Sequence, residues 1–63
     1  MTELLECFGN DGKVYIFPGA VAYIKYDDDM DAIEVHLING EIVHYKGTFE
    51  QFGRWVKKNG KKD

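Results

Sequence analysis

The stretch from residue 32 to residue 46, AIEVHLINGEIVHYK, constrains the fold of this chain more than any other. Two strand-like runs flank Asn39-Gly40, and Asn-Gly is the strongest short-range signal for a β-hairpin, because both central residues of a type I′ turn need positive φ. A two-residue loop also fixes the register. The expected pairs are Ile38 with Glu41, Leu37 with Ile42, His36 with Val43, Val35 with His44, and Glu34 with Tyr45.

Three further strands are expected before this hairpin. Residues 4–8, 13–17 and 20–26 are rich in aliphatic, β-branched and aromatic side chains, which favour strands. The turn formers Gly9-Asn10-Asp11-Gly12 should close a tight hairpin between the first two runs. Pro18-Gly19 should end the second run, because proline has no N–H to offer a strand ladder. The acidic residues 27–31 predict a polar loop.

One helix is expected, after the last strand. Thr48-Phe49-Glu50-Gln51 matches the capping box, in which the Thr48 hydroxyl and the Gln51 side chain bond each other's backbone N–H groups. The residues that follow place Phe49, Phe52 and Val56 at helical spacing, with Trp55 beside them. We expect Gly53 to lie where this helix packs closely on the sheet. The predicted fold is α+β, mainly β: an antiparallel β-meander of about five strands with one C-terminal amphipathic helix.

Size and composition limit the possible functions. Sixty-three residues form one domain, 1–63, with residues 1–3 and 60–63 expected to be frayed. A lone cysteine, Cys7, suits a reducing compartment, and no apolar stretch approaches the length of a membrane span, so we expect a cytoplasmic protein. Residues 1–50 carry three lysines against ten carboxylates, a formal charge of −7, whereas residues 51–63 carry five cations against one carboxylate, a charge of +4. An acidic body disfavours nucleic acid and favours basic or polar protein partners.

The predicted sheet has apolar groups on both faces. The expected register places one set of hairpin residues on one face, namely Ile33, Val35, Leu37, Ile42 and His44. It places a second set on the other face, namely Glu34, His36, Ile38, Val43 and Tyr45. One short helix covers only one face, and large exposed apolar patches mark interaction sites. We therefore expect a homodimer; the alternative is a tyrosine-rich face that tolerates water.

Catalytic and metal-binding patterns are weak in this sequence. It has no serine, so a Ser-His-Asp triad is excluded, and Cys7 lies in an apolar run typical of an inert buried thiol. The expected register places His36 and His44 on opposite faces, where one chain cannot direct both at one metal. The acidic loop matches the first positions of a calcium-binding EF-hand, but Ala32 replaces the required glycine and Ile38 the required glutamate. We expect no enzyme activity, no cofactor and no metal.

Residues 21–52 resemble one known family. Ala22-Tyr23-Ile24-Lys25, the hairpin, and then Gly47, Thr48 and Phe52 are similar to the first half of LytTR-type DNA-binding domains. The resemblance covers about half the chain and implies a strand, a hairpin and a capped helix. The second half of that family, which supplies much of its DNA contact, has no counterpart here, so the resemblance transfers no functional residues.

The leading hypothesis is a small non-enzymatic, homodimeric protein-binding module. Its size and charge also suit an inhibitor of a host defence protein, of the kind that phages and mobile elements encode. The candidate contact residues are aromatic anchors and an acidic rim, namely Tyr23, Tyr26, Tyr45, Trp55, Asp27, Asp28, Asp29 and Asp31. The alternative is a nucleic-acid-binding regulator that uses the basic end of the helix, namely Arg54, Lys57, Lys58, Lys61 and Lys62. A metal- or ligand-binding module is a third, weaker hypothesis.

Overall fold

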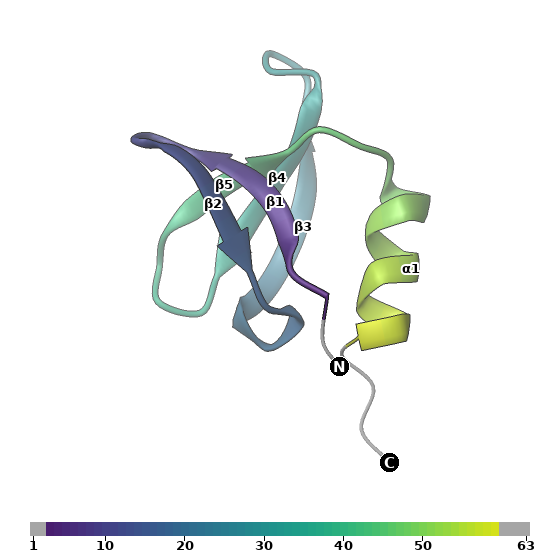
Figure 1. The fold of residues 1–63 in the computed structure, drawn as a ribbon. Coiled ribbons are helices and arrows are strands. Elements are labelled where there is room, and N and C mark those ends of the chain that lie inside the picture. Colours follow the sequence, from purple (N-terminus) through teal and green to yellow (C-terminus); the bar gives the residue numbers. More distant parts are fainter. Residues whose placement is uncertain (1–2, 60–63) are drawn as a thin grey trace.

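The computed structural model describes residues 3–59 and contains five strands and one α-helix (Figure 1). The elements in chain order are β1 (Leu5–Gly9), β2 (Gly12–Ile16), a 3-10 turn η1 (Pro18–Ala20), β3 (Val21–Asp27), β4 (Ala32–Leu37), β5 (Ile42–Tyr45) and α1 (Phe49–Asn59). All strand pairs are antiparallel. The predicted fold class, mainly β with one C-terminal helix, is confirmed.

The order of strands in the sheet is β2-β1-β5-β4-β3. The β1–β2 hairpin and the β3–β4–β5 meander are each sequential, and they join where Phe8 of β1 lies opposite His44 of β5. The first and last strands of the chain are therefore neighbours in the middle of the sheet. Because β2 and β3 lie at opposite edges, η1 and its flanking residues cross from one edge to the other.

The predicted register of the β4–β5 hairpin is wrong by one residue. Val35 lies opposite Val43, and His36 lies opposite Ile42. The loop has three residues: the Gly40 N–H donates to the Leu37 carbonyl at 2.9 Å, and the Leu37 N–H donates to the Glu41 carbonyl at 2.8 Å. Gly40 has φ of 94°, whereas Asn39 does not have the positive φ that a type I′ turn demands. This is the common three-residue loop that ends on a left-handed glycine.

A one-residue slip moves every side chain of a strand to the other face. Val43 and Tyr45 therefore join Ile33, Val35 and Leu37 on the face toward α1, which we call the inner face. Ile42 and His44 lie on the opposite, outer face, together with Glu34 and His36. The prediction that His36 and His44 lie on opposite faces is wrong as well. The hairpin thus alternates between apolar and polar residues more cleanly than the sequence-based register implied.

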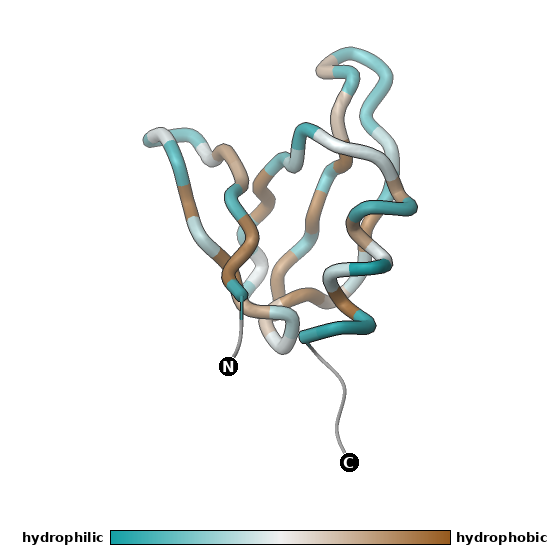
Figure 2. Tube along the Cα trace, turned by 45° about the vertical axis from the view of Figure 1, so that its right-hand side comes forward, coloured by the Kyte–Doolittle hydropathy of each residue, from teal (hydrophilic) through white to brown (hydrophobic). Residues whose placement is uncertain are grey.

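Strand β3 follows the same two faces after a local irregularity. A register shift between Val21 and Tyr23 leaves Val21 against the core, and beyond it Tyr23 and Lys25 point outward while Ile24 points inward. Val21 and Tyr23 therefore lie on opposite faces although they are two positions apart, because an inserted residue changes the alternation of a strand. Hydrophobic and hydrophilic residues alternate along the strands in Figure 2, and the tips of the β1–β2 and β3–β4 connections are hydrophilic.

The core lies between the inner face and α1. Its buried side chains come from four strands and from two positions of the helix, namely Leu5, Cys7, Ile16, Ile33, Val35, Leu37, Val43, Phe52 and Trp55. The predicted capping box is confirmed: the Gln51 N–H donates to the Thr48 hydroxyl at 3.0 Å, and the Thr48 N–H donates to Gln51 Oε1 at 2.9 Å. Two otherwise unpaired donors are satisfied, which fixes where α1 begins.

Two predictions about α1 need correction. A Cβ atom placed on Gly53 would meet nothing within 4 Å, so this glycine does not mark a close approach of helix and sheet. Glu3, which we expected to be frayed, is bonded to the helix at both backbone groups: its N–H donates to Asn59 Oδ1 at 2.8 Å, and its carbonyl accepts from the Trp55 indole at 2.6 Å. Residues 1–2 and 60–63, also expected to be frayed, lie outside the described residues.

Candidate protein-binding site

The outer face of the sheet is not covered by α1 and carries exposed apolar side chains. The single helix of residues 3–59 lies on the inner face, which leaves Phe8 of β1, Tyr15 of β2, Tyr23 of β3 and Ile42 of β5 exposed on the outer face. Phe8 is 39% exposed and Ile42 is 45% exposed, so both are partly packed yet reachable. Half-packed apolar groups on a sheet face suit a partner that completes their burial.

A hollow of about 800 Å³ lies next to Phe8 and Ile42 of this face. The tip of the β1–β2 hairpin, the β3–β4 turn and the start of β5 surround it. The outer-face and turn residues Phe8, Met30 and Ile42 line it on the apolar side, and the inner-face residues Val14 and Val43 reach it between the β1–β2 tip and β5. Its carboxylates are Asp11, Asp27, Glu34 and Glu41, and no lysine or arginine lines it.

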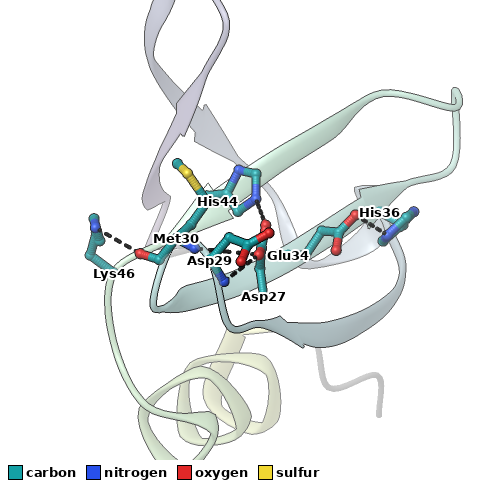
Figure 3. A network of polar contacts seen from close by, with 7 residues as sticks. All are labelled: Asp27, Asp29, Met30, Glu34, His36, His44 and Lys46. Carbon is teal, nitrogen blue, oxygen red and sulfur yellow. Dashed lines mark hydrogen bonds and ion pairs between the residues drawn. The ribbon is translucent and has the colours of Figure 1, made fainter.

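Two of the residues that line the hollow form a histidine-carboxylate pair, which Figure 3 shows. His44 Nε2 lies 3.0 Å from Asp27 Oδ2, and both side chains are about three-quarters buried. This contact with His44 is the main reason why the pKa of Asp27 lies below its usual value, and the N–H groups of Met30 and Asp29 act in the same direction. Because Asp27 Oδ1 also accepts from these two N–H groups, the carboxylate anchors the β3–β4 turn to β5.

A second pair lies beside the first on the outer face. His36 Nε2 lies 3.1 Å from Glu34 Oε2, and the His36 ring stacks on Tyr23 with ring centroids 4.3 Å apart. Figure 3 shows Asp27, Glu34, His36 and His44 in one region of the sheet. Lys46 lies beyond them and donates to the Met30 carbonyl at 3.3 Å. These polar and stacking contacts connect β3 with β4 and β5 on the outer face.

The aromatic residues proposed from the sequence do not form one surface. Tyr23 is exposed on the outer face, whereas Tyr26 packs near Phe49 of α1 and donates a hydrogen bond to Asp31. Tyr45 packs on Phe52 with ring centroids 5.8 Å apart. Trp55 is 6% exposed and belongs to the core, where a partner cannot reach it. Of the four predicted anchors, only Tyr23 lies on the same face as the hollow.

The predicted acidic rim is divided in the structure. Asp27 lies at the hollow, while Asp28, Asp29 and Asp31 are exposed in the β3–β4 turn. Asp31 has φ of 52° and accepts the Tyr26 hydroxyl, which raises the pKa of that tyrosine. These turn residues therefore shape the connection, and Asp27 is the member that reaches the outer face.

The basic residues of the alternative hypothesis lie on the helix. Arg54, Lys57 and Lys58 are exposed on α1, and Arg54 forms an ion pair with Glu50 at 3.0 Å. Lys57 and Lys58 lie in the last turn, where cations complement the helix dipole. Lys61 and Lys62 lie outside the described residues. The cations therefore lie on a different element from the outer face.

The chemistry available at the hollow is limited. A histidine oriented by a carboxylate is part of many acid-base sites, but no hydroxyl or thiol lines this hollow to serve as a nucleophile. Cys7 is fully buried on the inner side, and burial raises the pKa of its thiol to about 11. Within residues 3–59, no three His, Cys, Asp or Glu side chains are grouped to hold a metal ion. The hollow is suited to binding through contact and charge.

Sequence reasoning missed several residues of this site. Phe8, Met30, Ile42 and the carboxylates Asp11, Glu34 and Glu41 were not among the predicted contacts. The wrong register assigned Ile42 to the same face as the core residue Val35. The hollow also forms only because β1 pairs with β5. These strands are far apart in the sequence, and no local residue pattern predicts that they pair.

Comparisons with protein-family models, with curated proteins and with solved structures find no match to this chain. Among residues 3–59, no helix is long and apolar enough to cross a membrane.

Proposed function

We propose that this protein acts by binding another protein through the outer face of its sheet, without catalysing a reaction. One observation carries this proposal: Phe8 and Ile42 are exposed beside a hollow on the face that α1 does not cover. Aromatic and aliphatic side chains that can fill a pocket at an interface are typical of binding hot spots. The poor nucleophilicity of the buried Cys7 thiol also favours binding over covalent catalysis.

The homodimer remains a prediction, and the observed register weakens the argument for it. The observed register moves Val43 and Tyr45 toward the core, so the outer face has fewer apolar groups than expected. The role as an inhibitor of a host defence protein is also a prediction, based on size and charge alone.

A matched pair of substitutions tests the proposal. Ile42→Lys places a charge on the outer face, whereas Ile38→Lys makes the same change at a residue that is 70% exposed and does not line the hollow. Wild-type protein and both variants are used to capture proteins from cell lysate, and the captured proteins are compared by quantitative mass spectrometry. A partner identified in this way is then purified, and its dissociation constant is measured by calorimetry.

We expect Ile42→Lys to weaken binding at least tenfold and Ile38→Lys to leave it within about twofold, since an interface anchor is worth more than about 1.4 kcal/mol. Circular dichroism confirms that both variants are folded. Equal binding by the two variants would reject the outer face as the site. Sedimentation of the same three proteins tests the dimer: a self-association that only Ile42→Lys abolishes would identify a second copy as the partner.

A further inference from the structure

We infer that the hollow receives a lysine or arginine side chain of the partner, flanked by apolar residues. This inference rests on the proposed function and specifies the chemistry of the partner. It follows from the combination of apolar residues with four carboxylates and no lysine or arginine in the lining of the hollow. A long cationic side chain satisfies both parts, because its aliphatic stem packs on apolar groups while its charged end reaches carboxylates.

The positions of the carboxylates favour a bound cation. Asp27 and Glu34 already contact His44 and His36, so their side chains are held in place. Asp11 and Glu41 are exposed lining residues, and neither forms an ion pair within residues 3–59. A cation that enters the hollow would therefore meet two carboxylates held by histidines and two exposed carboxylates without an ion pair.

The apolar residues of the hollow argue against a simple metal or polyamine site. Phe8 presents an aromatic ring to the hollow, and a guanidinium or ammonium group is attracted to such a ring. Met30 and Ile42 are each nearly half exposed at the same hollow and can bury the apolar neighbours of the cation. The surrounding carboxylates would repel the phosphates of a nucleic acid. The combination fits a cationic, partly apolar protein segment.

The test uses defined peptides and the whole protein labelled with ¹⁵N. The probes are acetyl-Gly-Leu-Xaa-Leu-Gly-amide peptides in which Xaa is arginine, lysine, citrulline or glutamate; citrulline has the shape of arginine without its charge. Each peptide is titrated to millimolar concentration at neutral pH while the backbone amide signals are followed. We expect the arginine and lysine peptides to shift signals of Phe8, Glu34, Ile42 and His44. The citrulline peptide should bind several-fold more weakly, and the glutamate peptide should give no shifts.

A charge-neutralised variant locates the interaction. Asp11→Asn combined with Glu41→Gln removes the two exposed carboxylates of the hollow and should weaken arginine-peptide binding by about threefold to tenfold, the range for two exposed charge pairs. Glu50→Gln on α1 is the matched control and should bind like wild type. Raising the salt from about 0.02 M to about 0.3 M should weaken the arginine peptide more than the citrulline peptide.

Three results would overturn the inference: equal binding of the arginine and citrulline peptides, no shifts with any peptide, or shifts confined to the exposed β3–β4 turn. The partner found with the Ile42→Lys and Ile38→Lys pair separates this inference from the proposed function. A partner that loses affinity for Ile42→Lys but binds the Asp11→Asn/Glu41→Gln variant normally would leave the outer face as the binding site. The inference that the hollow receives a cationic side chain would then be rejected.

Discussion

The register of the β4–β5 hairpin can be tested with one pair of neighbouring substitutions. Val43→Thr and Ile42→Thr both introduce threonine and keep a β-branched side chain, so their effects on strand propensity are similar. Val43 is 3% exposed and faces the core, whereas Ile42 is 45% exposed on the outer face. The observed register therefore predicts very different costs for two adjacent positions.

The magnitudes follow from burial. At position 43 the substitution places a hydroxyl in the apolar core, where an unpaired polar group costs about 1–3 kcal/mol, so we expect a loss near 2 kcal/mol. At position 42 the hydroxyl reaches water, and the loss of one half-buried methylene costs roughly 0.4 kcal/mol, so the total should stay below about 1 kcal/mol.

Equilibrium unfolding in urea, followed by the fluorescence of the buried Trp55, measures both costs. With a slope near 1 kcal/mol per molar urea for so small a domain, Val43→Thr should lower the midpoint by about 2 M and Ile42→Thr by less than about 1 M. Unchanged slopes would show that both variants unfold from the same native fold. A larger loss for Ile42→Thr than for Val43→Thr would refute the three-residue loop and restore the two-residue Asn-Gly turn.

Three further predictions concern single residues. Gly53→Ala should raise stability by about 0.5–1 kcal/mol in urea unfolding, because a Cβ there meets no atom and alanine favours the helix; a loss would contradict the open surroundings of this glycine. Cys7 should react with iodoacetamide at pH 8 only as fast as the protein unfolds. Because its folded pKa of about 11 lies above the ordinary 9.0, stability should fall by up to about 3 kcal/mol as the pH rises from 9 to 11, and this part of the loss should vanish in Cys7→Ala. Asp27 has a lowered folded pKa, so its contribution to stability is present above the ordinary value of 3.8 and is lost as the pH falls through the folded value; Asp27→Asn should therefore lose less stability than wild type between pH 7 and pH 3, and an equal loss would contradict the His44 contact.

Short-range signals predicted the elements of this fold. The turn at residues 9–12, the break at Pro18-Gly19 and the capping box at Thr48 each depend on residues within four positions of one another, so their geometry is set locally. Five strands and one helix could therefore be read from the sequence.

The candidate site depended on contacts between distant residues. Asn39-Gly40 is compatible with a two-residue or a three-residue loop. With either loop, one face of β5 receives Ile42 and His44 and the other receives Val43 and Tyr45. Because both pairs contain one aliphatic and one ring side chain, composition does not show which pair faces the core. The packed structure chooses, because Tyr45 meets Phe52 of α1 on the inner side and Val43 lies next to Gly9 of β1. Local residue patterns were enough to define which segments are strands and which is the helix. The side of β5 that meets the core, and with it the composition of the outer face, depends on packing between segments far apart in the chain.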